Sequence, residues 1–391
     1  MVTLASITLV GPLAIHAFLP VMPVVKDVFG ISDAMGGLMF SVSLFVVAFS
    51  TLVYGSLSDR YGRRPVLLAG LILFIIGSGV AAVASSVSSL VTARIIQALG
   101  AGCSVGLTRA IARDAYGADG LVKVIAYLSM AYTLGPMTAP LFGGMLVDAG
   151  GWRSVFWFAT IAGVVIAASA YRVLHETHPR AAVPQQHSHF LRDYAQLFSH
   201  LRFAAFVLQS GFSSATFFAM GAAAAFLMKN YLGRSATEFG LYFMLFPIGF
   251  LVGSLLSSRL SQRVPIETMV LAGSLLNFIA VAAQSAIVLA GHVTPLVLFV
   301  PGFLITFGQG IALPNAQVGT LRVIPNLAGT AAGVGVFCQM FLGAVFVQIY
   351  SALSDGTPNP MLVTVGIASI LTLGAGVIPF ILKKRAAAIQ S

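Results

Sequence analysis

Long apolar runs, separated by short polar segments, form the dominant pattern of this 391-residue chain. A helix of about 20 residues crosses the hydrocarbon core of a bilayer, and the runs have roughly that length. The first run lacks a basic leader and continues past the length of a signal peptide, so we expect it to remain as the first span. The pattern predicts an all-α integral membrane protein with about twelve spans, at residues 3–25, 34–57, 66–84, 88–111, 123–147, 153–174, 201–228, 237–258, 266–290, 294–319, 328–352 and 360–382.

Basic residues are distributed unevenly between the two ends of these spans. An even number of spans places both chain ends on the same side of the membrane. Lysine and arginine in short loops resist translocation, so the side that is richer in them faces the cytoplasm, and we expect both termini there. That side has Arg60, Arg63, Arg64, Arg109, Arg113, Lys123, Arg172, Arg180, Arg192, Arg202, Arg259, Arg263, Arg322, Lys383, Lys384 and Arg385, and the other has Lys26, Arg153, Lys229 and Arg234.

The composition excludes an ordinary water-soluble globule, because 58% of the residues are hydrophobic and only 8% are charged. The formal net charge of +10 would suggest nucleic-acid binding in a soluble protein. Here the basic residues lie at the ends of spans, as membrane orientation requires, so we expect no nucleic-acid partner. Cys103 and Cys338 both fall in apolar runs, which indicates neither a disulfide framework nor a cysteine metal site.

One extended polar segment, residues 175–200, divides the chain into two predicted six-helix bundles at 1–174 and 201–391. Residues 253–263 repeat the glycine and the basic pair of residues 55–65, which favours an internal duplication. The central segment also contains histidines, which would suit either a metal sensor or a solvated linker. The linker is favoured because no cysteine or carboxylate pair completes a coordination geometry. These histidines are His175, His178, His187, His189 and His200.

The densest run of charge lies between the second and third predicted spans, at Gly55–Pro65. Its glycines and its proline favour a turn. A loop that served only to orient the chain would need no acid and no fixed glycines. The run matches G-x-L-x-D-R-x-G-R-R and so resembles the loop 2–3 signature of the major facilitator superfamily. The resemblance implies that superfamily's two six-helix bundles and a gating role for Asp59, Arg60 and Arg63. Asp59 would face the N-terminus of the eleventh span, near residues 326–329.

The fourth predicted span has Arg94 several residues inside the apolar run. A guanidinium there costs about 2.5–3.5 kcal/mol, so it should face a water-filled cavity or a partner, unless it snorkels to the nearer interface. Arg94 and Gln97 resemble the superfamily's helix-four motif R-x-x-Q-G, with one extra residue before the glycine. At the cytoplasmic end, Arg109 and Arg113 repel each other at i,i+4 spacing. We expect them to form a charge cluster with Asp114 and with acids from elsewhere.

The fifth predicted span combines prolines with small residues, which bend a membrane helix and permit close helix contacts. This pattern resembles the helix-five motif of proton-driven exporters. Simple helix packing is compatible with the same residues. They are Gly135, Pro136, Pro140, Gly143 and Gly144.

Longer stretches at 11–23, 109–116, 308–315 and 328–333 are similar to the bicyclomycin- and chloramphenicol-resistance subfamily of drug:proton antiporters. That subfamily has an aspartate in the first span, where this chain has His16, and no carboxylate lies at the middle of a predicted span. His16 titrates near physiological pH and is therefore the candidate coupling residue, the alternative being a neutral histidine hydrogen-bonded within the bundle. By analogy, spans 1, 4, 7 and 10 line a central cavity with His16, Phe18, Gln97, Gln209, Phe212, Phe217 and Asn315.

The resemblance implies a secondary transporter of the bacterial inner membrane that exports drug-like or small organic solutes by alternating access. The proton is the expected coupling ion, and no cofactor or metal is implied. The missing aspartate leaves an uptake or facilitative carrier open, and a membrane ligand sensor is the alternative from another class. The sequence has no H-E-x-x-H, no G-x-S-x-G and no paired intramembrane carboxylates, so we expect no enzyme. We expect a monomer whose partners are a small organic substrate and the lipid bilayer.

Overall fold

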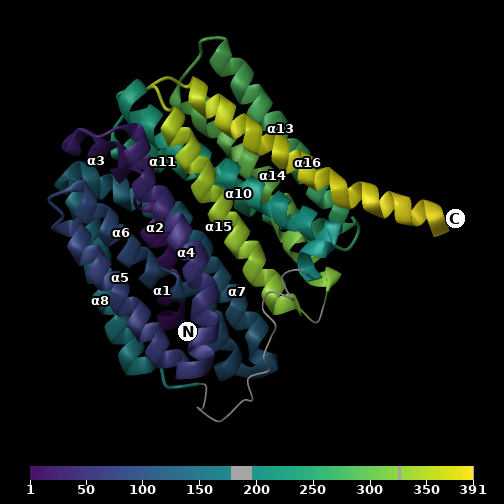
Figure 1. Ribbon diagram of the computed structural model, residues 1–391, viewed down its shortest axis with the longest axis horizontal. Helices are drawn as coiled ribbons and strands as arrows, with labels where there is room; N and C mark the ends of the chain where they lie inside the picture. Colours follow the sequence, from purple (N-terminus) through teal and green to yellow (C-terminus); the bar gives the residue numbers. More distant parts are fainter. Residues whose placement is uncertain (178–195, 325–326, 391) are drawn as a thin grey trace. The chain divides into compact units, whose positions relative to one another are not determined.

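The computed structural model describes residues 1–177, 196–324 and 327–390, and no strand occurs among them. Helices joined by short connections account for most of these residues (Figure 1). The chain divides into two compact units, one of Met1–Val183 with Met228–Met244 and one of Pro184–Leu227 with Leu245–Ser391. The all-α architecture expected from the sequence is confirmed.

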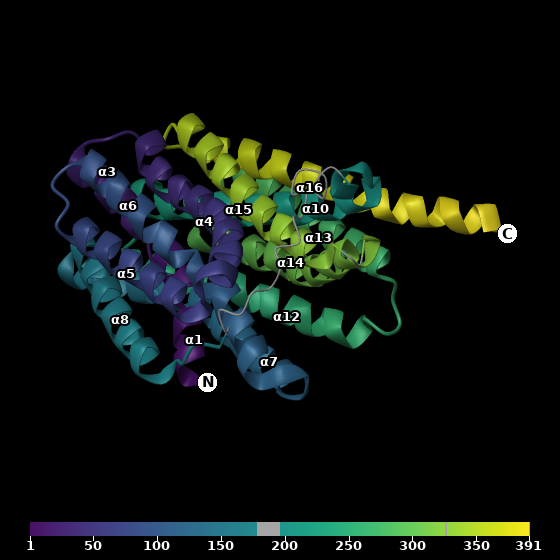
Figure 2. The same ribbon diagram turned by 60° about the horizontal axis from the view of Figure 1, so that its bottom comes forward.

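Two helices of the first unit, α5 and α6, pack at backbone contact distance because each supplies a glycine. A Cβ on Gly77 of α5 would lie 2.2 Å from the backbone nitrogen of Gln97, and a Cβ on Gly100 of α6 would lie 2.2 Å from that of Phe74. Small residues permit this approach in membrane helices. Helix α5 also packs on α8, and Figure 2 shows these two side by side. The unit contains α1 (Val2–Thr8), α2 (Val10–His16), α3 (Val21–Phe29), α4 (Asp33–Tyr61), α5 (Arg63–Ala82), α6 (Val87–Ala101), α7 (Cys103–Gly150), α8 (Trp152–Val173) and α11 (Ala236–Phe243).

The predicted first span is divided into α1, α2 and α3. The bend between Val2–His16 and Val21–Phe29 is 45°. Proline explains both interruptions, because it has no N–H to donate to the carbonyl four residues earlier. Pro12 leaves the carbonyl of Thr8 without that bond, and α1 ends at this residue. Pro20 interrupts the hydrogen-bond ladder again, directly before α3.

The predicted fourth and fifth spans, 88–111 and 123–147, are not separated by a non-helical loop. Helix α6 ends at Ala101, and the helical conformation of α7 runs from Cys103 to Gly150. The loop predicted at 112–122 is therefore helical, which is possible because that segment contains no proline.

In the second unit, α10 packs against α14, α15 and α16, while α14 packs against α12 and α13. In the first unit, α6 likewise packs against α4 and α5. The fourth span of each half thus contacts the second and third spans of the same half, as an internal duplication would produce. The helices of the second unit are α10 (Leu201–Phe226), α12 (Leu245–Leu260), α13 (Ile266–Leu289), α14 (Pro295–Val323), α15 (Ala328–Leu353) and α16 (Asn359–Gln390). The π-helix η1 (Leu227–Tyr231) follows α10 and belongs to the first unit from Met228 on.

Ten helices of the described chain are long and apolar enough to span a membrane, or eleven if the bent pair in the first span is counted as one more. The sequence predicts about twelve spans, and the predicted span at 123–147 lies within the long helix α7.

Residues 228–244, which the sequence assigns to the C-terminal bundle, pack in the first unit, where α11 lies against α7.

Candidate functional site

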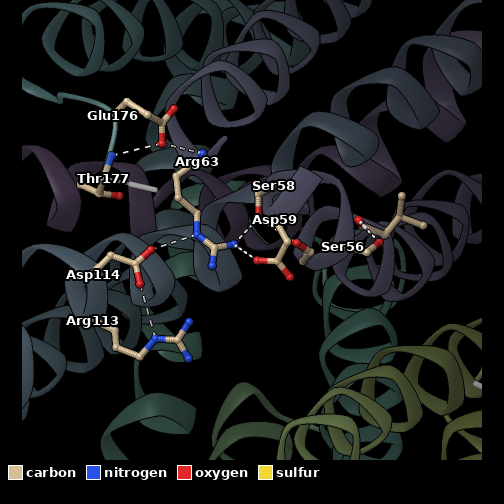
Figure 3. A network of polar contacts seen from close by, with 10 residues as sticks. Ser56, Ser58, Asp59, Arg63, Arg113, Asp114, Glu176 and Thr177 are labelled. Carbon is tan, nitrogen blue, oxygen red and sulfur yellow. Dashed lines mark hydrogen bonds and ion pairs between the residues drawn. The ribbon is translucent and has the colours of Figure 1, made fainter. Parts of the chain in front are cut away.

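Arg63, the first residue of α5, is at the centre of a polar network in the first unit (Figure 3). Its side chain is only 6% exposed. The Nε atom lies 3.1 Å from Oδ2 of Asp114, on α7. The Nη1 atom donates to Oγ of Ser58 at 2.5 Å and lies 2.6 Å from Oδ1 of Asp59. One guanidinium therefore joins the end of α4, the start of α5 and the first half of α7.

Glu176, just beyond α8, binds the backbone of the same turn. Its carboxylate accepts hydrogen bonds from the N–H groups of Arg63 at 2.9 Å and Arg64 at 3.2 Å. These groups begin α5 and have no partner within the helix, so an anion is favoured there. Gly62 provides the space, because its φ is 97° and a Cβ on it would lie 2.6 Å from Oε2 of Glu176. Sequence analysis missed Glu176, although an acid directly after the sixth span, on the side of the basic loop, is a readable signal.

The other predicted gating residues near this network are more exposed than Arg63. Arg113 is 65% exposed, and its Nε lies 3.6 Å from Oδ1 of Asp114. Arg109 is exposed, and the exposed Arg60 lies over the ring of Tyr61, 5.2 Å from its centroid. The structure therefore places Arg63, rather than Arg109, as the buried partner of Asp114.

Arg94 lies inside the first unit and is 1% exposed. Its Nη1 donates to the backbone carbonyl of Ala14 on α2 at 2.9 Å, and its Nε to that of Met39 on α4 at 3.4 Å. Nη1 also donates to Oε1 of Gln97 at 2.5 Å, and Gln97 donates onward to Oγ of Ser78 on α5 at 2.8 Å. The guanidinium thus turns toward neighbouring helices, which differs from the snorkelling alternative.

Phe18 and His16 follow shortly after Ala14, the residue whose carbonyl binds Arg94. The ring of Phe18 is 2% exposed, and its centroid lies 4.2 Å from Cζ of Arg94. His16 ends α2, is 4% exposed, and has Nδ1 3.1 Å from the carbonyl oxygen of Pro12. Because a carbonyl only accepts, Nδ1 holds the proton in this contact. The low exposure of His16 places the imidazole inside the first unit, and a coupling role for it stays a prediction.

The helix-five motif lies on α7, and two of its glycines face the first span. A Cβ on Gly135 would lie 2.3 Å from Cβ of Pro12, and a Cβ on Gly143 would lie 2.8 Å from the carbonyl oxygen of Ala17. Close packing therefore requires glycine at both positions. The prolines of the motif lie inside α7 and are Pro136 and Pro140.

The end of α7 also contacts the start of α11. A Cβ on Gly144 would lie 2.2 Å from the carbonyl oxygen of Ala236. Asp148 accepts hydrogen bonds from the backbone N–H of Ala236 at 3.3 Å and of Thr237 at 2.8 Å. Partial burial alone would raise the pKa of Asp148, but hydrogen bonds from Thr237, Ala236 and Ser235 outweigh it and hold the pKa below its ordinary value. The sequence signal for this contact is an acid just after the paired glycines, which sequence analysis missed.

The predicted cavity amides of the second unit are buried and hydrogen-bonded to hydroxyl groups. Gln209 on α10 donates to Oγ of Ser274 on α13 at 3.0 Å. Asn315 on α14 donates to Oγ of Ser257 on α12 at 2.7 Å. These amides join helix pairs, and their contact with a substrate stays a prediction.

The predicted cavity phenylalanines of the second unit are half-buried and lie among other aromatic rings. Phe212 packs edge-on against Phe346 at a centroid distance of 6.0 Å. Phe217 lies 6.1 Å from Phe246. Both rings therefore take part in aromatic packing, and their contact with a substrate stays a prediction.

A second charged junction lies at the start of α13. Glu267 is 3% exposed and forms ion pairs with Arg202, at the start of α10, and with Lys383 on α16, at 3.0 Å. In each six-span half of the chain, the end of the sixth span thus meets the start of the third span. The acid is Glu176, just after the sixth span, in the first unit, and Glu267, at the start of the third span, in the second unit. Sequence analysis did not identify this reversed pair.

No group of three histidine, cysteine, aspartate or glutamate residues gathers to hold a metal in the part of the chain that the structure describes. His178, His187 and His189 lie outside the described residues, so the linker interpretation of the central segment stays a prediction.

Comparisons with known proteins agree with these motifs. A sequence model of the Major Facilitator Superfamily matches residues 4–347. The chain is similar to the bicyclomycin resistance protein homolog of Haemophilus influenzae, with 24% identity over 375 residues that cover 95% of this chain and 93% of that protein. It is similar to the chloramphenicol resistance protein of Pseudomonas aeruginosa, with 27% identity over 371 residues that cover 92% and 85%.

Among solved structures, the chain is similar to a bacterial homolog of the human lysosomal transporter Spinster in an inward-facing and occupied conformation. The TM-score is 0.78 at 17% identity, and the match covers 98% of this chain and 96% of the other. At that identity the likeness concerns the fold alone. Because the family model matches most of the chain, the resemblance of the loop 2–3 signature is confirmed. The chain belongs to the major facilitator superfamily of membrane transporters.

Proposed function

We propose that this protein exports drug-like or small organic solutes across the bacterial inner membrane by proton-driven alternating access. It would act as a monomer with both termini in the cytoplasm. The observation that supports export most strongly is the match to the bicyclomycin resistance protein homolog, which covers 95% of this chain and 93% of that protein. A match of this extent includes both bundles and is not limited to a shared loop motif.

The Arg63 network supports a gate at the cytoplasmic side. In alternating access, charged contacts at helix ends form in one state and separate in the other, so their strength sets the balance between states. Asp59 is 62% exposed and paired with Arg63, which leaves it accessible to a further partner. Its proposed partner is the positive N-terminus of the eleventh span. Residues 325–326 of that region lie outside the described residues.

The contact of Asp148 with α11 supports a second gate at the opposite end. The eighth span begins at α11, and α7 ends the fifth span, so opening the outer side would require them to separate. The backbone approach at Gly144 and the capping of α11 by Asp148 would both be lost in that step. Each end of the transporter would then have an acid that binds the start of a helix in one state.

Proton coupling would act through His16. A proton that enters down about 100 mV contributes about 2.3 kcal/mol, and about 1.4 kcal/mol corresponds to a tenfold gradient. Exchange of one proton for a neutral solute could therefore sustain a solute gradient of about forty-fold. The buried position of His16 in the first unit supports this role, because a charge gained there would change the balance between states.

An uncoupled carrier is the second candidate, and the contact between Nδ1 of His16 and the carbonyl of Pro12 favours it. A histidine held in this way can be purely structural. A ligand sensor is the third candidate, and it would move neither the solute nor protons across the membrane.

Flux into everted membrane vesicles separates these functions, with radiolabelled chloramphenicol as the first probe. An exporter accumulates the probe in energised vesicles above its outside concentration, and a facilitative carrier equilibrates it without accumulation. Vesicles with and without the protein would behave alike if it is a sensor. Equilibration alone would overturn the proposal of driven export.

A further inference from the structure

Arg94 is too deep in the first unit to reach water along its own helix. It lies seven residues after the start of α6, which is about 10 Å at 1.5 Å per residue. Its guanidinium binds the carbonyl of Met39, which is at a similar depth in α4. The side chain is 1% exposed. A buried charge of this kind needs a counter-charge or a dense set of hydrogen bonds.

Among the residues that the structure describes, the groups that contact this guanidinium are neutral. They are the backbone carbonyls of Ala14 and Met39, the amide oxygen of Gln97 and the ring of Phe18. These groups orient the cation, but none of them offsets a full positive charge. The acids of the chain lie near the ends of the predicted spans or in loops.

The guanidinium also has donor capacity that the described residues leave unused. Its Nη2 is buried and has no hydrogen-bond partner among them. The same side chain lines a cavity with room for about one water-sized particle. The lining of this cavity is otherwise apolar except for one amide, and includes Leu13, Phe18, Gln97, Val155 and Phe156.

From these observations we infer that the cavity beside Arg94 binds a small monovalent anion of the halide class. The ion would accept hydrogen bonds from Nη2 and neutralise the guanidinium inside the bundle. The limited volume excludes a drug-sized solute and favours a bare ion over a larger oxyanion. The inference does not depend on which solute is transported or in which direction.

Thermal unfolding of the full-length protein in lipid nanodiscs tests this inference. The unfolding midpoint is compared in sodium chloride, sodium bromide and sodium gluconate at one pH and one ionic strength. A ligand that binds only the folded state raises the midpoint, and we expect a rise of about 2–4 °C that saturates with halide concentration. Arg94→Gln should remove the dependence on halide. Equal midpoints in all three salts for the wild type would overturn the inference.

Arg153→Gln is the matched control. Arg153 also lies over an aromatic ring, 4.2 Å from the centroid of Trp152, and donates to a backbone carbonyl, that of Ala84, at 2.8 Å. It lies at the start of α8 and outside the cavity, so its replacement should leave the halide effect intact. Loss of the effect in this variant would show that the halide effect does not depend on the cavity beside Arg94, and would overturn the inference.

A second measurement does not depend on how well the Arg94 variant folds. Crystals of the wild-type protein grown in bromide should show an anomalous peak within hydrogen-bond distance of Nη2 of Arg94. Absence of that peak at full bromide exchange would count against the ion. Sodium acetate, at the same pH and ionic strength, extends the unfolding series. If acetate raises the midpoint and the halides do not, the site takes carboxylate groups and the halide inference is wrong.

Discussion

The backbone N–H of Thr237 donates a 2.8 Å hydrogen bond to Oδ2 of Asp148, although the two residues are 89 positions apart in the sequence. This bond joins the end of the fifth span to the start of the eighth within one compact unit. A carboxylate at the first turn of a helix is stabilising by about 0.3–1 kcal/mol. If the proposed outer gate lies here, its opening has to break this bond.

Replacement of Asp148 by asparagine should therefore loosen this end of the transporter. Asparagine still accepts one hydrogen bond but lacks the charge that favours the helix N-terminus. A cysteine placed at Ala236, which is 8% exposed, should react faster with a membrane-impermeant maleimide in the Asp148→Asn background, by about two- to fivefold for a loss of about 0.3–1 kcal/mol.

Asp355→Asn is the control for this experiment. Asp355 also accepts a backbone hydrogen bond, from Thr357 at 2.9 Å, but the bond is local to one loop. Labelling at position 236 should be unaffected by this change. Equal labelling in the Asp148→Asn and wild-type backgrounds would contradict a gating contact.

The contact of Asp148 should also have a defined pH dependence. Hydrogen bonds hold the pKa of Asp148 below its ordinary value despite partial burial. A carboxylate with a depressed pKa stabilises the fold above its unfolded-state pKa, and this contribution is lost as the pH falls through the folded-state value. The difference in unfolding midpoint between wild type and Asp148→Asn should stay constant from about pH 8 to about pH 5 and shrink only below about pH 4. A difference that already disappears at about pH 6 would require another titrating group.

Gly62→Ala should destabilise the Arg63 network. The φ of 97° strains any residue with a side chain, and the new Cβ would meet the carboxylate of Glu176. Such strain costs about 1–3 kcal/mol and should lower the unfolding midpoint of the purified protein.

Gly55→Ala is the matched change in the same motif. Gly55 is helical, and a Cβ on it would meet no described atom within 4 Å apart from its chain neighbours and the nearby backbone of its own helix. Alanine should therefore be neutral or stabilising there, by at most about 1 kcal/mol. Similar losses at both positions would show that the motif does not depend on the cap from Glu176.

The ion pair of Arg63 with Asp114 should be strongly coupled, because both side chains are largely buried, at 6% and 16% exposure. In a double-mutant cycle with Arg63→Gln and Asp114→Asn, we expect a coupling energy of about 1–3 kcal/mol in unfolding free energy. A cycle that replaces Arg113, which is 65% exposed, in place of Arg63 should give about 0–0.5 kcal/mol. Reversed magnitudes would assign the structural role to Arg113.

The spans could be predicted from sequence because the hydropathy of each run is a local property. Pro12 and Pro20 are also local signals, and they account for the breaks in the first span. The charge junctions are different, because Glu176 binds the backbone of Arg63 across 113 positions and Glu267 binds Lys383 across 116. Hydropathy does not determine which span ends meet.

Other parts of the site depend on packing between helices. Arg94 could be identified as an intramembrane charge, but its neutral partners on α2 and α4 follow from how closely these helices approach. The assignment of residues 228–244 to the first unit follows from the fit of α11 against the glycines of α7. Neither contact can be predicted from the hydropathy of one span, because each depends on how two helices pack.

Proton release from everted vesicles tests the central claim most directly. Respiration acidifies the lumen, and a pH-sensitive dye then reports the lumenal proton concentration while chloramphenicol is added outside. A proton-driven exporter should move protons out of the lumen as it takes up the solute, so the lumenal pH should rise on addition in wild-type vesicles and should not rise with His16→Gln. Uptake of chloramphenicol by the wild-type protein without any change in lumenal pH would contradict proton-coupled export.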